Sequence, residues 1–178
     1  MSITTKKGDD GTTGLLFGGR TPKDGPRPTA YGEVDEAQAT LGVVRAQADA
    51  ELAAIVLGIQ RDLWVLMAEL ATAAENAAKL TDGQTRTTEA MVDGLEATMD
   101  DISGRFEPPT EFVVPGESAV AAALDVSRTV VRRAERAAVA ALGDQESWAV
   151  PYLNRLSDLL WTLARWQEGE SRTTRSVT

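Results

Sequence analysis

Apolar residues recur every three or four positions along most of the chain, which is the spacing of helices that bury one side. The longest such segment, residues 49–78, carries a regular leucine and isoleucine stripe that Trp64 and Met67 widen, so we expect one long core helix there. No segment indicates a strand. The other helices are expected over residues 29–47, 85–104, 117–142 and 149–169, with glycine and proline between them.

The N-terminal residues 1–28 are loop-like and rich in glycine, threonine and charge. Glycines allow backbone N–H groups to turn toward one anion, and threonine hydroxyls add further donors. Lys6, Lys7 and Lys23 could supply the opposite charge. A Walker A phosphate loop is excluded because no Gly-Lys-Ser/Thr closes the spacing. A flexible terminus without a ligand is the alternative, and the polar residues 170–178 are expected to be disordered unless a ligand or partner orders them.

The helix expected over residues 117–142 places Arg128, Arg132, Glu135 and Arg136 on one face. Three guanidinium groups at this spacing repel one another unless an anionic group faces them. Arginine binds carboxylates and phosphates with two parallel hydrogen bonds, which suits an anionic ligand. The alternative is an ordinary solvated face with a local ion pair. Asp35, in the first helix, is either a solvated acid near a helix N-terminus or the partner of one of these arginines.

Two further features have both a structural and a functional interpretation. Phe112, just before the arginine helix, is either a plug that packs onto the core or an aromatic contact for a large flat ligand. On the last helix, four side chains lie on a different face from the leucine stripe. They are Asn154, Asp158, Trp161 and Arg165. Of these, Asn154 and Asp158 suit a ligand, a metal-bound water or a hydrogen-bonded seam between helices.

The composition of the chain excludes several kinds of binding site and catalytic chemistry. The chain has 178 residues and a formal net charge of −9, with neither cysteine nor histidine. Its acidity argues against general nucleic-acid binding, and the missing residues exclude disulfides, thiol catalysis, histidine acid–base chemistry and the usual zinc sites. The composition does not exclude a bound magnesium ion, because magnesium needs only oxygen ligands and substrate phosphates. No signal peptide or membrane-spanning run is apparent, so we expect a cytoplasmic protein that does not enter a membrane.

Three stretches together resemble the PduO-type ATP:cob(I)alamin adenosyltransferases, also called corrinoid adenosyltransferases. They occur in the family's order and spacing, and the similarity runs from about Thr4 to Arg165. The departures are Thr4, in place of an aromatic residue, and Lys7, in place of a small or polar one. The stretches are Thr5-Lys-Lys-Gly-Asp-Asp-Gly-Thr-Thr, Ala30-Tyr-Gly-Glu-Val-Asp-Glu, and Phe112-Val-Val-Pro-Gly followed by Arg128, Arg132-Arg-Ala-Glu-Arg and Leu153-Asn-Arg-Leu-Ser-Asp.

The resemblance implies an all-α, five-helix bundle of the ferritin-like type that assembles as a homotrimer with active sites between subunits. One domain would span residues 1–178, made of an ATP-binding loop (1–28), the bundle (29–169) and a tail (170–178). The implied enzyme transfers the 5′-deoxyadenosyl group of ATP to the cobalt of cob(I)alamin, with magnesium, giving adenosylcobalamin and triphosphate. A flavin-type reductase and an adenosylcobalamin-dependent enzyme are the implied partners. The alternatives are a non-catalytic ATP or corrinoid sensor or carrier, and a purely structural bundle.

The resemblance also assigns roles to individual residues. Asp35 and Arg128 would pair across the subunit interface, Phe112 would pack below the corrin ring, and these three would bind cobalamin. Together with Arg132 they form the predicted catalytic set. The predicted ATP contacts are Thr5, Lys6, Lys7, Gly8, Thr13, Gly14, Lys23, Arg132, Arg133, Glu135, Arg136 and Asn154.

Overall fold

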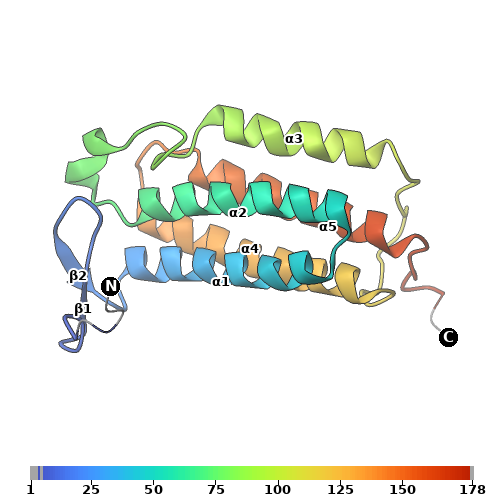
Figure 1. Cartoon of the computed structure of the whole chain (residues 1–178), viewed down its shortest axis with the longest axis horizontal. Coiled ribbons are helices and arrows are strands. Elements are labelled where there is room, and N and C mark those ends of the chain that lie inside the picture. Colours follow the sequence, from blue (N-terminus) through green and yellow to red (C-terminus); the bar gives the residue numbers. More distant parts are fainter. Residues whose placement is uncertain (1–3, 5, 177–178) are drawn as a thin grey trace.

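The computed structural model describes residues 4 and 6–176, and most of this length is helical. Five α-helices run side by side along one long axis, with α3 on the outside of the group (Figure 1). The mostly helical architecture with five α-helices is therefore confirmed for the described residues. The elements are β1 Thr12–Gly14, β2 Arg20–Pro22, α1 Pro26–Gln47, α2 Ala50–Leu70, the 3-10 helix η1 Ala74–Lys79, α3 Glu89–Ser103, α4 Ala119–Leu142 and α5 Ala149–Glu168.

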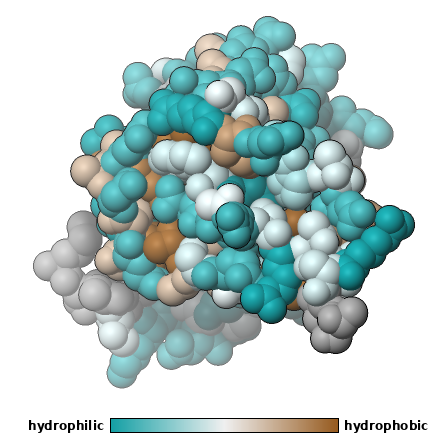
Figure 2. Space-filling view, turned by 90° about the vertical axis from the view of Figure 1, so that its right-hand side faces the viewer, coloured by the Kyte–Doolittle hydropathy of each residue, from teal (hydrophilic) through white to brown (hydrophobic). Residues whose placement is uncertain are grey.

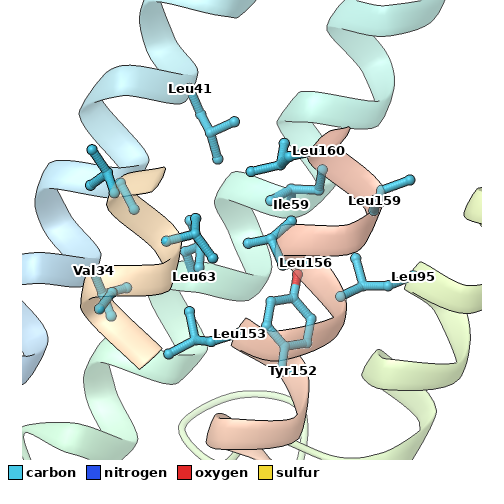
Figure 3. Close-up of a cluster of buried hydrophobic side chains, with 14 of the residues drawn as sticks. Val34, Leu41, Ile59, Leu63, Leu95, Tyr152, Leu153, Leu156, Leu159 and Leu160 are labelled. Atoms are coloured by element: carbon cyan, nitrogen blue, oxygen red, sulfur yellow. The ribbon is translucent and has the colours of Figure 1, made fainter. Parts of the chain in front are cut away.

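The last helix, α5, is the centre of the packing, because both α4 and α3 pack against it. Figure 3 shows Val34 of α1, Leu63 of α2 and Leu95 of α3 gathered around its side chains. Burying one leucine contributes about 1.5–3 kcal/mol, so this stripe fixes the helices that carry the functional residues. The predicted stripe of α5 is completely buried and consists of Leu153, Leu156, Leu160 and Leu163.

The prediction for the second helix is wrong in two respects. Trp64 does not widen the buried stripe; its side chain is 68% exposed. The helix also ends at Leu70 instead of continuing to residue 78. Arg27 donates from Nη1 to the Leu70 carbonyl at 3.1 Å, and the N–H of Leu16 donates to the Ala71 carbonyl at 2.8 Å. These contacts, from residues distant in the sequence, bind carbonyls that a continuing helix would need for itself.

The N-terminal segment contains an antiparallel hairpin that the sequence did not indicate. Strands β1 and β2 pair in the register Thr12 with Pro22 and Gly14 with Arg20. The first helix begins at Pro26, earlier than predicted, because proline is well suited to the first turn of a helix, where its missing N–H costs nothing. Thr29 is therefore inside the helix, where its hydroxyl donates to the Gly25 carbonyl at 3.0 Å.

Two other helix starts also differ from the prediction. Helix α3 begins at Glu89, because Thr85 belongs to the preceding turn, where its hydroxyl accepts from the N–H of Thr81 at 2.8 Å. Helix α4 begins at Ala119 and is capped by Ser118, whose hydroxyl accepts from the N–H of Ala121 at 3.1 Å. Neither shift changes which residues lie on the arginine face.

The tail is ordered by the chain itself over its described residues, in contrast to the expected disorder. It pairs with the segment around Phe112: the N–H of Val114 donates to the Arg172 carbonyl at 2.8 Å. The N–H of Thr174 donates to the Phe112 carbonyl at 2.9 Å. Two short stretches from before α4 and after α5 therefore lie as antiparallel neighbours.

The hairpin and the Phe112 segment lie at opposite ends of the bundle (Figure 1). Helix α4 has 24 residues, so the bundle is about 36 Å long at 1.5 Å per residue. Figure 2 faces the end where the C-terminus lies; hydrophilic side chains cover most of it, with small separate hydrophobic patches between them. The chain thus presents two distinct regions to ligands, one at each end.

Candidate active site

The N-terminal hairpin and the loop before it enclose a pocket of about 680 Å³. Six of the predicted ATP contacts line this pocket, which confirms that they lie together, although their role stays a prediction. Thr5, the seventh predicted contact in the loop, lies outside the described residues. The six are Lys6, Lys7, Gly8, Thr13, Gly14 and Lys23.

Gly8 leaves room for the side chain of Lys23, which crosses directly over it. A Cβ atom added at Gly8 would lie 2.9 Å from both Cε and Nζ of Lys23, and 3.2 Å from the carbonyl oxygen of Thr12. A larger residue would push the lysine ammonium away from the pocket. The glycine therefore lets a positive charge approach the backbone of the loop.

Asp10 and Arg20 hold this loop in shape, and the sequence did not identify Arg20. The guanidinium of Arg20 donates to the Lys7 carbonyl at 2.8 Å and to the Asp10 carboxylate at 3.3 Å. The N–H of Thr12 also donates to that carboxylate, at 2.9 Å. This hydrogen bond is the main reason that the pKa of Asp10 lies below its usual value. The carboxylate of Asp10 is therefore stabilised in its charged form by the loop that it holds together.

The second pocket, about 510 Å³, lies at the other end of the bundle beside Phe112. Phe112 is 87% exposed, so the interpretation as a core plug is wrong. Arg128, Asp125, Trp161 and Arg165 contribute to the pocket wall. The pocket thus combines an exposed aromatic ring with the partly exposed guanidinium of Arg128, a combination that suits a large ligand with both flat and polar parts.

A buried ion-pair network lies behind this wall. The side chain of Arg165 is 1% exposed, and its Nη2 donates to Asp125 at 2.5 Å and to Glu168 at 2.8 Å. The Trp161 ring lies 5.7 Å from the Arg165 guanidinium carbon. Asp125 also accepts from Nε of Arg128 at 3.4 Å. Sequence reasoning missed Asp125; the available signal was an acid next to Leu124, three residues before Arg128, on an otherwise alanine- and leucine-rich helix.

The other arginines of α4 have different surroundings. Arg132 and Arg136 are exposed, and Arg136 donates to the Arg132 carbonyl at 2.9 Å. Arg133 instead binds Glu33 and Glu36 of α1, and these carboxylates raise its pKa above the usual value. Its guanidinium is therefore engaged within the chain.

The predicted site residues on α5 do not form one cluster with a shared ligand. Asn154 donates to Glu135 at 3.0 Å, which brings two predicted ATP contacts together. Asp158 instead accepts from Arg155 at 3.1 Å, and Arg165 is committed to its buried network. The interpretation as a seam between helices therefore describes Asn154 and Arg165 best.

Asp35 is exposed on α1, and no ion pair joins it to another residue of the described part of this chain. Its predicted pairing with Arg128 crosses between subunits, so it stays a prediction. The two pockets lie toward opposite ends of the bundle, since the N-terminal loop lines one and the Phe112 segment lines the other.

The sequence was compared with models of known protein families. Residues 3–167 match the family described as cobalamin adenosyltransferase. The chain belongs to this family. A corrinoid adenosyltransferase from Citrobacter freundii is 40% identical over 172 residues, covering 93% of this chain and 94% of the relative. One from Mycobacterium bovis is 39% identical and covers 96% of this chain and 95% of the relative.

Solved structures of this family are also similar to the chain. A variant of the PduO-type ATP:corrinoid adenosyltransferase from Lactobacillus reuteri, complexed with cobalamin and ATP, superposes with a TM-score of 0.88. It is 28% identical in sequence, and the match covers 98% of this chain and 97% of that one. A second variant of the same enzyme, complexed with ATP, gives a TM-score of 0.86. The fold recognised in the sequence is therefore confirmed over nearly the whole chain.

None of the described helices is long and apolar enough to cross a bilayer. Within residues 4 and 6–176, no three acidic side chains converge as a metal site would require.

Proposed function

We propose that this protein transfers the 5′-deoxyadenosyl group of ATP to the cobalt of cob(I)alamin. The observation that carries the proposal is the match to the cobalamin adenosyltransferase family over residues 3–167. The Lactobacillus reuteri enzyme, whose fold matches this chain, was solved with both cobalamin and ATP. The pockets beside the N-terminal loop and beside Phe112 have the charge and the aromatic surface that these two ligands need.

The active site is completed by a second copy of the chain, arranged as a homotrimer. The two pockets lie at opposite ends of one bundle, so ATP and the corrinoid would meet where the loop of one subunit approaches the α4 helix of another. Exposed Asp35 and half-buried Arg128 supply opposite charges for such an interface. A buried, hydrogen-bonded pair of this kind fixes the relative orientation of two subunits more than it adds affinity.

In the reaction, the reduced cobalt attacks the 5′ carbon of ATP, a cobalt–carbon bond forms, and triphosphate leaves with the electron pair of the broken carbon–oxygen bond. The protein needs no nucleophile or acid–base group of its own. Its task is to place the 5′ carbon in line and to stabilise the leaving charge. Arg132, Arg136 and the loop lysines Lys6, Lys7 and Lys23 are suited to that task because they are exposed and positively charged.

Magnesium supplies further neutralisation of the triphosphate when it is bound. Because the described residues include no cluster of three acidic ligands, we propose that the ion is carried mainly by the phosphates of ATP. The oxygen-rich loop pocket, with Thr13 and Asp9 at its wall, fits an ion bound in this way.

Phe112 would act on the corrinoid. Its ring is available to occupy the lower axial face of the cobalt, because 87% of the side chain is exposed at the pocket. Displacing the corrinoid's own base would leave the cobalt(II) state four-coordinate and easier to reduce. Phe112→Ala should therefore reduce turnover far more than it reduces ATP affinity.

The test is an anaerobic absorbance assay with cob(I)alamin, magnesium and ATP. Loss of the cob(I) band with appearance of a photolabile adenosylcobalamin spectrum would support the proposal, and Arg132→Ala should nearly abolish it at ATP concentrations that only just saturate the wild-type protein. Thermal melting with and without ATP runs in parallel, because a ligand that binds the native state raises Tm. A rise in Tm without conversion would favour a non-catalytic sensor or carrier, and neither signal would leave a structural bundle.

A further inference from the structure

The wall of the Phe112 pocket contains a charged side chain whose position depends on a residue behind it. Arg128 lines the pocket with its side chain 29% exposed. Its ion-pair partner in the described part of the chain is Asp125, one turn earlier on α4, at 3.4 Å from Nε to Oδ1. Because Arg128 has a long flexible stem, this contact restricts where its guanidinium can lie.

Asp125 is itself held rigidly. Its side chain is 7% exposed, and its second oxygen, Oδ2, accepts from Nη2 of Arg165 at 2.5 Å. Arg165 comes from α5, is 1% exposed, and lies against the Trp161 ring. The two oxygens of one buried carboxylate therefore connect a fixed arginine in the core to an arginine at the pocket wall.

The charges of this network balance only when Arg128 is counted. Asp125 and Glu168 carry two negative charges, and Arg165 and Arg128 carry two positive ones. Glu168 already pairs with Arg165 at 2.8 Å, so the buried arginine would keep one partner if Asp125 were neutralised. Arg128 would keep none within the described chain. Arg128 therefore depends on Asp125 more than Arg165 does, even though the bond from Arg165 to Asp125 is the shorter of the two.

We propose that Asp125 is a positioning residue that orients Arg128 at the Phe112 pocket, with Arg165 as its buried anchor. This inference rests on the proposed function, because the pocket is taken to bind the corrinoid. It extends that function by assigning the orientation of Arg128 to its own subunit. Asp125 does not touch the reacting atoms; it holds Arg128 from within its own subunit, and the proposed pairing of Arg128 with Asp35 of a neighbouring copy would add a second contact to the same guanidinium.

The competing interpretation is a purely structural ion pair that holds α4 to α5. Buried pairs of this kind are strongly destabilising when one partner is lost, whatever their role. The two interpretations differ in what a neutral substitution should change. A structural pair predicts loss of stability that affects every kinetic constant, whereas a positioning residue predicts a selective effect on the corrinoid.

The experiment compares Asp125→Asn with Glu168→Gln, which removes the other carboxylate of Arg165 without contacting Arg128. Both variants are assayed anaerobically for KM of cob(I)alamin, KM of ATP and kcat, with Tm measured for each. We expect Asp125→Asn to raise the corrinoid KM on the order of tenfold, with the ATP KM unchanged. Glu168→Gln should lower Tm without that selective change.

A double substitution tests the coupling directly. If Asp125 acts through Arg128, Asp125→Asn should add almost nothing to the defect of Arg128→Ala. Additive defects in the double variant would overturn the proposal, as would equal kinetic losses in Asp125→Asn and Glu168→Gln that follow their Tm. An inactive wild-type protein would instead contradict the proposed function.

If Asp125→Asn does not fold, Asp125→Glu is used in its place. Asp125→Glu keeps the charge and moves the carboxylate by one methylene, so it should shift Arg128 without unbalancing the network. We expect a raised corrinoid KM in this variant at near wild-type Tm. An unchanged corrinoid KM would show that the position of this carboxylate does not determine that of Arg128.

Discussion

Asn154 of α5 donates its side-chain amide to the Glu135 carboxylate of α4 at 3.0 Å, and both residues were predicted to contact ATP. The bond fixes the amide beside the exposed Arg132 and Arg136 face. Each of the two side chains therefore determines where the other lies. If ATP binds here, it meets a surface that is already organised, which lowers the entropic cost of binding.

Asn154→Ala should raise the KM for ATP by about two- to tenfold, the equivalent of one ordinary hydrogen bond. Glu135→Ala should raise the KM for ATP by a similar factor. The double variant should raise it no further, because each single substitution already breaks the same hydrogen bond. Asp158→Ala is the matched control, since it lies one turn further along α5 and bonds to Arg155. Steady-state assays with varied ATP measure the effect; independent, additive losses would contradict it.

Arg133 should behave differently from its neighbour Arg132, because it binds Glu33 and Glu36 of α1. Arg133→Ala should lower Tm, and the decrease should be smaller at high salt, where exposed ion pairs are screened. Arg132→Ala should raise the KM for ATP while leaving Tm nearly unchanged. Equal increases in the ATP KM for both variants, at unchanged Tm, would restore Arg133 as an ATP contact.

Tyr152 donates its hydroxyl to Asp62 of α2 at 3.0 Å in the interior of the bundle. Burial raises the pKa of Asp62, and the Tyr152 bond partly opposes that rise. A carboxyl with a raised folded pKa contributes stability at low pH and loses it as pH rises through the folded pKa. Tyr152→Phe removes the opposing bond, so the pKa of Asp62 should rise further.

We therefore expect Tyr152→Phe to cost about 1–3 kcal/mol of unfolding free energy at neutral pH and less at acid pH. Urea denaturation at a series of pH values measures this dependence. Asp62→Asn is the control: it keeps an acceptor for the Tyr152 hydroxyl and cannot titrate, so the pH-dependent part should disappear. A cost in Tyr152→Phe that is constant with pH would exclude Asp62 as its source.

Asp10 titrates below its usual value of 3.8, chiefly because it accepts from the N–H of Thr12. Its contribution to loop order should be present above that value and lost as pH falls through the lowered pKa. Arg20 is a smaller cause, so the pKa of Asp10 in Arg20→Ala should rise only part of the way. The carboxyl carbon shift of Asp10, followed by NMR, measures this pKa. A return to 3.8 in Arg20→Ala would identify Arg20 as the main cause.

The helices could be predicted because their apolar period is regular. The four leucines of the α5 stripe, for example, were all correctly assigned to the core: Leu153, Leu156, Leu160 and Leu163. Their ends could not, because distant contacts decide them. The carbonyl of Leu70 ends α2 by accepting from Arg27, a residue 43 positions away. The hairpin strands are only three residues each, too short for an alternating pattern to be visible.

The candidate site divides in the same way, into residues that a local sequence pattern indicates and residues that only contacts in the folded chain reveal. Local motifs indicated the loop residues and the arginine face as candidates, and six of the loop candidates line one pocket. Asp125 was missed because an acid in a helix usually indicates an exposed position; only its pairing with Arg165, 40 residues away, reveals that it is buried. Phe112 was left open between a core plug and a contact for a large flat ligand; its backbone pairs with the tail, and its side chain is exposed.

That pairing leads to a prediction about the tail. The N–H of Thr174 donates to the Phe112 carbonyl at 2.9 Å, which helps to fix the segment that carries the exposed ring. Thr174→Pro removes this donor, whereas Thr174→Ala keeps it and removes only the side chain. Loss of one hydrogen bond should raise the corrinoid KM by about two- to tenfold in the proline variant alone.

The KM for ATP should be unchanged in both variants, because neither Thr174 nor Phe112 lines the loop pocket that holds the predicted ATP contacts. Assays with varied cob(I)alamin and with varied ATP separate the two effects. If Thr174→Ala and Thr174→Pro weaken the corrinoid equally, the threonine side chain is responsible and the backbone bond is not. If neither weakens it, Phe112 is held by its own segment, and the tail contributes nothing to the pocket.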